Sequence, residues 1–179
     1  MSNFSIDIIN PHWIDNKVDN DFDTCSHGEF ILTIGGHEIL NANDKADWTT
    51  CTSVLQLLRG IEDDFTKSKN QIILHCSGLM MLSCPVGIYW KLNHDGSTVI
   101  IREIKKQLAI SEIDAIKFPM VASIDLEEYK REVLNVAKKV KEFYNRSKPR
   151  VVSNDKYDIE EYKKFWNEFD SLYEKYSKI

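Results

Sequence analysis

The order of apolar and polar residues predicts β-strands over the first two thirds of the chain. Phe4–Ile9 alternates apolar and polar positions, as a half-buried strand does, and Asn10-Pro11 is a turn signal that ends it. Gly28–Ile34 repeats the alternation. Gly35-Gly36 then separates it from a short extended run at 37–40, which indicates a tight hairpin, because such turns need positive φ.

The clearest hairpin signal lies in the middle of the chain. Two alternating runs, 86–93 and 97–104, flank Asp95-Gly96, a pair that favours a tight turn between antiparallel strands. In the first run, the side chains expected to face the core are Val86, Ile88, Trp90 and Leu92. Three further extended segments are predicted at Gln71–Cys76, Ala115–Phe118 and Val121–Ile124.

Helical periodicity appears once among the strands and twice at the end of the chain. Asp47 is expected to cap a first helix that begins near Trp48 and keeps Phe65 on its apolar face. Asp125, followed three residues later by Glu128, resembles a capping box at the start of a second helix.

The last predicted helix concentrates aromatic residues. Seven of the 19 aromatic residues lie between positions 157 and 176, and six of them follow a helical stripe with steps of three and four. The stripe consists of Tyr162, Phe165, Trp166, Phe169, Leu172, Tyr173 and Tyr176. Asp158 is expected to cap this helix. Most of the stripe should pack inside the protein, and the residues predicted to serve a protein partner are Trp166, Tyr173 and Tyr176.

Together these elements predict an α+β fold. We expect a mostly antiparallel sheet with one intervening helix and two long C-terminal helices packed on it. A length of 179 residues is usual for one domain, so a single α+β domain is predicted over residues 1–179. With 42% hydrophobic residues, the chain can build a sizeable core without a disulfide or a metal.

The chain is acidic, and its acidic groups are concentrated in the first 120 residues. The net charge is −5, and residues 1–120 carry 16 acidic and 10 basic groups. This charge argues against binding of a nucleic-acid backbone and favours steering toward a basic protein. The acidic residues predicted to contact such a partner are Asp19, Asp21, Asp23, Glu62, Asp63 and Asp64.

The chain start and the apolar runs predict a cytoplasmic protein that does not insert into a membrane. Residues 1–7 lack the basic and apolar regions of a secretory signal. The longest apolar run, at 77–89, contains Cys, Pro and Gly and is too short to cross a bilayer. The four cysteines are therefore expected to be reduced thiols.

Cysteine and histidine supply the candidate chemistry. Cys25, His27, His75 and Cys84 are candidate metal ligands, because thiolate and imidazole suit zinc. The paired Cys-x-x-Cys spacing of structural zinc sites is absent, so we expect packed cysteines, no metal and no cofactor. A Cys/His nucleophile made from Cys25 with His27, or Cys84 with His75, is an alternative, but no catalytic signature surrounds either pair and no catalytic residue is predicted.

Several short segments resemble a family of uncharacterised small bacterial proteins of low-GC Gram-positive species. The segments are Ser26-His27-Gly28-Glu29, Trp48-Thr49-Thr50, Leu57-Leu58-Arg59, His75-Cys76 and Cys84-Pro85-Val86-Gly87-Ile88-Tyr89-Trp90. The resemblance covers nearly the whole chain and implies no catalytic residues. By analogy with other small acidic α+β proteins, it implies an immunity protein.

Three function classes follow from the sequence. The first is a non-enzymatic binding protein, an immunity protein that blocks the active site of a bacterial toxin with a basic domain. The second is a small enzyme or metal-binding protein that uses the Cys and His residues. The third is a structural module that forms homo-oligomers.

Overall fold

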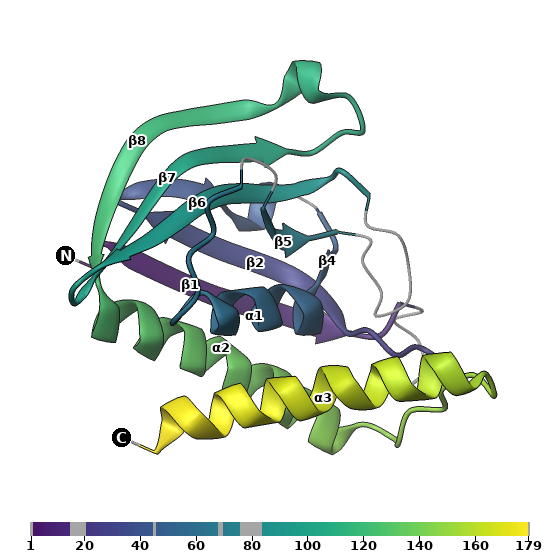
Figure 1. Cartoon of the computed structure of the whole chain (residues 1–179). Coiled ribbons are helices and arrows are strands. Elements are labelled where there is room, and N and C mark those ends of the chain that lie inside the picture. The colour runs from purple at the N-terminus through teal and green to yellow at the C-terminus, as the bar shows by residue number, and fades with distance from the viewer. Residues whose placement is uncertain (1, 15–20, 45, 68–69, 76–83, 179) are drawn as a thin grey trace.

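In the part of the chain that the structure describes, the fold consists of a curled antiparallel sheet and three α-helices (Figure 1). The computed structural model describes residues 2–14, 21–44, 46–67, 70–75 and 84–178. One helix lies between strands in the sequence, and two longer helices follow the last strand. The predicted α+β class, with its mostly antiparallel sheet, is confirmed.

The sheet contains eight strands, and every described pairing is antiparallel. The strands are β1 Phe4–His12, β2 His27–Ile34, β3 His37–Leu40, β4 Trp48–Thr49, β5 Gln71–Leu74, β6 Gly87–Asp95, β7 Thr98–Gln107 and β8 Ile116–Asp125. Their spatial order is β1-β2-β4-β5-β6-β7-β8, and β3 pairs with β2.

Alternation builds β1 and β2 as predicted, but the expected end of β1 at Asn10-Pro11 is wrong, because the strand continues through a register shift to His12, which pairs with His27. In β1 and β2 the register places Phe4 opposite Ile34 and Ile6 opposite Leu32, and all four side chains are buried. Because side chains alternate between the two faces of a strand, this register puts the apolar set of both strands on one face.

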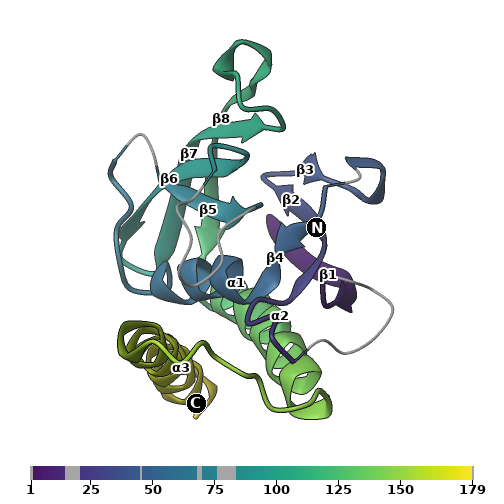
Figure 2. The ribbon, with the colours of Figure 1, turned by 90° about the vertical axis from the view of Figure 1, so that its right-hand side faces the viewer.

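The sheet curls until its two ends approach each other (Figure 2). The β2–β3 turn contains Gly35 and Gly36, both at positive φ as predicted. A Cβ atom at Gly35 would lie 2.6 Å from Met120 Cε and 3.1 Å from Ala122 Cβ, so this turn packs against β8. Asn3, which precedes β1, also donates from Nδ2 to the Ser123 carbonyl of β8 at 3.4 Å. The curl therefore encloses a core between the first and last strands.

The central hairpin is confirmed, and β8 is longer than expected. Gly96 has a φ of 57° in the turn that joins β6 to β7. The two predicted segments at 115–118 and 121–124 form the single strand β8, because both pair with β7. Pro119 lies within β8, which pairs only with β7 among the described strands. An edge position tolerates proline, which has no backbone N–H to donate.

Helix α1, Thr50–Arg59, starts and ends differently from the prediction. Its N-cap is Thr49, so the expected cap at Asp47 is wrong. The helix stops at Gly60, where a Cβ atom would lie 2.7 Å from the Tyr129 hydroxyl. The expected extension to Phe65 is also wrong, because Phe65 forms a bridge with Leu92 of β6.

Helix α2, Leu126–Arg146, packs against β1 and α1. Asp125 caps it as predicted, with its side chain accepting from the backbone N–H groups of Glu127 and Glu128. Glu128 does not complete a capping box. Its Oε1 instead accepts from the backbone N–H groups of Asn3 at 2.7 Å and Phe4 at 3.1 Å, which joins the helix to the start of β1.

Helix α3, Lys156–Ser177, packs against α1 and α2 on the side away from the sheet (Figure 2). Its N-cap is Asp155, which accepts from Tyr157 N and Asp158 N, so the expected cap at Asp158 is wrong. Arg59 of α1 forms a two-pronged ion pair with Glu168 of α3, with N–O distances of 2.6 and 2.8 Å.

Candidate functional site

The structure brings some of the predicted Cys and His residues into pairs. His75 Nδ1 lies 3.9 Å from Cys84 Sγ, so these two candidates are neighbours. Cys25 lies beside Cys51, a residue that the sequence reasoning did not select, at 3.8 Å between the two sulfur atoms. Cys76 lies outside the described residues. Among the described residues, no group of three or more His, Cys, Asp and Glu side chains could hold a metal ion.

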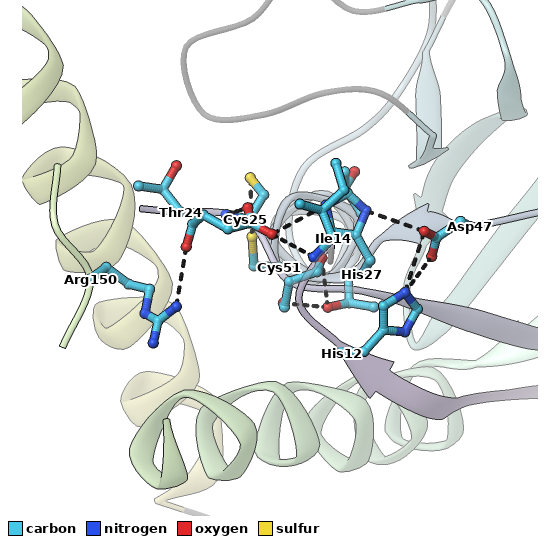
Figure 3. A network of polar contacts seen from close by, with 12 residues as sticks. His12, Ile14, Thr24, Cys25, His27, Asp47, Cys51 and Arg150 are labelled. Carbon is cyan, nitrogen blue, oxygen red and sulfur yellow. Dashed lines mark hydrogen bonds and ion pairs between the residues drawn. The ribbon is translucent and has the colours of Figure 1, made fainter. Parts of the chain in front are cut away.

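His27 belongs to a chain of alternating histidines and aspartates (Figure 3). His12 at the end of β1 pairs in register with His27 at the start of β2, and their rings stack at 6.1 Å. Asp47, just before β4, lies 3.3 Å from His12 Nε2 and 3.9 Å from His27 Nδ1. Asp23 lies 3.9 Å from His27 Nε2. Each ring therefore has a carboxylate beside it.

Backbone groups and burial define the electrostatics of this His–Asp chain. Asp23 is held in place because its carboxylate accepts from Ile14 N at 2.8 Å and from Cys25 N at 3.1 Å. Burial lowers the pKa of His27, although the Asp47 and Asp23 carboxylates oppose the shift. The lowered pKa favours the neutral form of the His27 imidazole.

The sequence predicted other roles for some members of the His–Asp chain. Asp47 was assigned to a helix cap, Asp23 to a partner surface, and His12 received no role. No sequence spacing reveals the cluster, because its members come from three separate segments that meet only when β1, β2 and β4 pair.

The predicted acidic surface falls into two separate parts. Asp21 and Asp23 precede β2. Asp23 lies near the start of α1, because its carboxylate accepts from Cys25 N and Cys25 contacts Cys51 in the first turn of α1. Glu62, Asp63 and Asp64 follow the other end of α1. A helix of 10 residues is about 15 Å long, which exceeds the Debye length of about 8 Å at physiological salt. The two groups therefore act as independent charges, and Asp19 lies outside the described residues.

Two members of the second acidic group already have internal partners. Glu62 pairs with Lys175 at 2.6 Å, and Asp64 pairs with His94 Nδ1 at 2.9 Å. These contacts lower the pKa of Glu62, chiefly through the hydrogen bond from Lys175, and the pKa of Asp64 through the hydrogen bond from His94. Both are surface pairs, which contribute little to stability.

The aromatic residues of α3 face inward for the most part. Phe165, Phe169 and Tyr176 are buried, while Trp166 and Tyr173 are half-buried against the core. The Trp166 ring lies 4.4 Å from the Tyr144 ring of α2. Inward packing accounts for the apolar character of most of the stripe. The role of Trp166, Tyr173 and Tyr176 in partner binding stays a prediction.

Among the described residues, the largest group of exposed aliphatic side chains lies elsewhere, on the β7–β8 hairpin. We call its members the hairpin tip, and they are Leu108, Ile110, Ile113 and Ile116. Ile110 is 80% exposed and Ile113 is 92% exposed. Figure 1 shows this end of the hairpin projecting away from all three helices. Contiguous exposed apolar side chains are a mark of interaction surfaces, whereas single ones are ordinary.

Hydrogen bonds hold the hairpin tip in one shape. Gln107 is fully buried, and its Nε2 donates to the carbonyls of Ala109 at 3.1 Å and Ile110 at 3.3 Å. Ser111 Oγ accepts from Ile113 N at 3.3 Å and caps the short 3₁₀ helix η2, Glu112–Asp114. The loop is thus ordered by polar contacts while its isoleucines face solvent. Sequence reasoning missed this site because no periodic pattern marks residues 108–115.

Comparison of the chain with protein-family models, curated proteins and solved structures gave no match. No helix within the described ranges is long and apolar enough to span a membrane. The geometry described above is therefore the basis for assigning a function.

Proposed function

We propose that this chain is a non-enzymatic protein-binding domain that inserts its hairpin tip into an apolar pocket of a partner. The observation that carries this proposal is a pre-ordered loop with exposed isoleucines. Ordering a loop costs conformational entropy, and a loop already held by Gln107 and Ser111 avoids part of that cost on binding.

The charge around the hairpin tip suggests the chemistry of the partner. Glu112 and Asp114 alternate with the exposed isoleucines, and the whole chain carries a net charge of −5. Lys105 neutralises Glu112 in part, at 3.2 Å. Lys117, next to Ile116, is also exposed, so the charge at the hairpin tip itself is mixed. The exposed isoleucines fit an apolar pocket, and the net charge of −5 over the whole chain favours approach to a basic protein.

A toxin with a basic domain is a partner of this kind. More specifically, we propose that the chain is an immunity protein that binds such a toxin. It rests on the family resemblance and on analogy with small acidic α+β proteins. In this role the hairpin tip occupies the toxin's active site and excludes its substrate.

The test uses a double variant of the hairpin tip, Ile110→Ser/Ile113→Ser. An immunity protein is expected to have its toxin gene immediately upstream, and binding to the purified product of that gene is measured by biolayer interferometry. Buried aliphatic anchors at an interface each contribute about 1–2 kcal/mol, so the double variant should bind roughly 100-fold more weakly. Its thermal midpoint should stay unchanged, because both side chains are exposed.

Tyr157→Ser is the matched control, since Tyr157 is also exposed but lies at the start of α3. Equal affinity of the double variant and the wild type refutes the hairpin tip as the binding surface. Growth protection in cells that co-express the upstream product separates an immunity protein from a general binding domain. Loss of a concentration-dependent oligomer in the double variant supports the homo-oligomer alternative instead.

A second candidate function is acid–base chemistry at the His–Asp chain. The observation that favours it is the position of the His27 ring between the Asp23 and Asp47 carboxylates, each 3.9 Å from a ring nitrogen. A small hydrolase that uses His27 as a general base requires that His27→Ala abolish turnover while the fold is kept. If the His27→Ala protein still turns over a generic ester or phosphodiester substrate, this role is excluded.

A further inference from the structure

Cys25, two residues before β2, and Cys51, in the first turn of α1, are neighbours in the fold. Strands β2 and β4 pair antiparallel with His27 opposite Thr49, and Thr50 N donates to Ser26 O at 2.7 Å one step further along. Helix α1 starts at Thr50, and its first turn holds Cys51 close to Cys25. Their sulfur atoms lie 3.8 Å apart, although 26 residues separate them in the sequence.

The surroundings hold the two backbones together. Ser26 Oγ and Thr50 Oγ1 share a hydrogen bond of 2.5 Å, and Thr50 Oγ1 also donates to the Ser26 carbonyl at 3.2 Å. The Tyr144 hydroxyl of α2 accepts from Ser26 N and donates to Thr24 O, both at 3.0 Å. The segment around Cys25 is thus fixed by contacts from both α1 and α2.

We propose that Cys25 and Cys51 are a redox modification site. A low-molecular-weight disulfide such as oxidised glutathione oxidises the two thiols, and a reversible Cys25–Cys51 disulfide forms. The two sulfur atoms are 3.8 Å apart, and the adjacent residues Ser26 and Thr50 are hydrogen-bonded to each other, so only a small movement separates the thiols from disulfide geometry. The sulfur atoms need to approach by about 1.8 Å to reach bonding distance, which rotation of the two side chains supplies. Neither thiol has a role in the binding function proposed above.

The reaction proceeds by two exchange steps. The Cys25 thiolate attacks one sulfur of oxidised glutathione, forms a mixed disulfide and releases one glutathione thiolate. The Cys51 thiolate then attacks the Cys25 sulfur and displaces the second glutathione. The two cysteines lose two protons and two electrons in total, and oxidised glutathione is reduced to two molecules of glutathione.

Burial sets the rate of the first step. Cys25 is 4% exposed and Cys51 is 0% exposed, so the oxidant reaches them only when the start of α1 opens locally. Cys84 is partly exposed and reacts sooner. The pair therefore responds to sustained oxidation and not to brief exposure.

The disulfide would connect the His–Asp chain to α1. Cys25 N donates to the Asp23 carboxylate, and His27 lies two residues further along. Joining Cys25 to the first turn of α1 restricts this segment in both the folded and the unfolded chain. Closing a loop of this length should raise the thermal midpoint by on the order of 10 °C.

The experiment uses the Cys76→Ser/Cys84→Ser protein, in which Cys25 and Cys51 are the remaining thiols. It is incubated with oxidised glutathione and measured by intact mass spectrometry and thermal unfolding. We expect a mass loss of about 2 Da, a higher thermal midpoint, and reversal of both by dithiothreitol. The same protein with Cys51→Ser is the control, and it should keep a bound glutathione and show no rise in midpoint.

Refolding from urea in the same glutathione buffer is the second measurement, because it exposes both thiols before the core closes. The proposal is overturned when the refolded protein keeps two thiols, or carries one glutathione on each cysteine. A disulfide that forms but lowers the thermal midpoint also overturns it, since the bond then strains the fold. These readouts involve no partner, so their failure leaves the hairpin-tip proposal intact.

Discussion

Replacing Phe169 with alanine should strongly destabilise the protein. Phe169 is 0% exposed and lies at the centre of the face that α3 packs against the other helices. Its ring contacts those of Phe165 and Trp166, with centroids at 6.2 and 5.3 Å. Truncation removes these contacts and leaves a cavity, because the packed helices close it only in part.

The expected loss follows from this burial. A fully buried phenylalanine changed to alanine typically costs about 3–5 kcal/mol of unfolding free energy. Domains have about 5–15 kcal/mol in total, so Phe169→Ala removes a large share. For a chain of this size the thermal midpoint should fall by roughly 6–20 °C. Tyr157→Ala, at a position that is 66% exposed on the same helix, should change stability by about 0.5 kcal/mol or less.

Urea unfolding followed by far-ultraviolet circular dichroism measures both variants. Equal slopes with denaturant in the wild type and the variants allow their free energies to be compared directly. A loss below about 1 kcal/mol for Phe169→Ala would show that α3 does not depend on this contact. In that case its aromatic face would be a surface for a partner, and the inward packing described above would not be its main role.

Two further predictions concern a helix cap and a half-buried histidine. Asp155→Ala should cost about 1 kcal/mol through loss of the α3 cap, whereas Asp158→Ala should cost only a few tenths, and equal losses in urea unfolding would contradict the cap assignment. The lowered pKa of His27 means that the unfolded chain binds a proton before the folded chain does. Stability should therefore fall as pH drops through about 6.5, and unfolding free energies between about pH 8 and 5 should fall less steeply in His27→Gln. An identical pH dependence in both proteins would remove His27 as a cause.

The sequence determined the elements whose signals are local. Alternation in β1 and β2 fixes which side chains share a face, because successive residues on a strand point to opposite sides. The glycine pair before β3 and Gly96 set their turns through positive φ, which glycine adopts without strain. Asp125 was recognisable as a cap because its partners lie two and three residues away.

Tertiary structure decided the features that depend on distant partners. Asp47 was a reasonable helix cap by sequence, yet the pairing of β2 with both β1 and β4 places it beside His12 and His27. Glu128 does not make the local hydrogen bond expected of a capping box. Its carboxylate accepts from two backbone N–H groups at the start of β1 instead. Cys25 and Cys51 became neighbours for the same reason, through the pairing of β2 with β4. Local propensity is set by a few adjacent residues, but these contacts join segments tens of residues apart, and only the curl and register of the sheet define which of them meet.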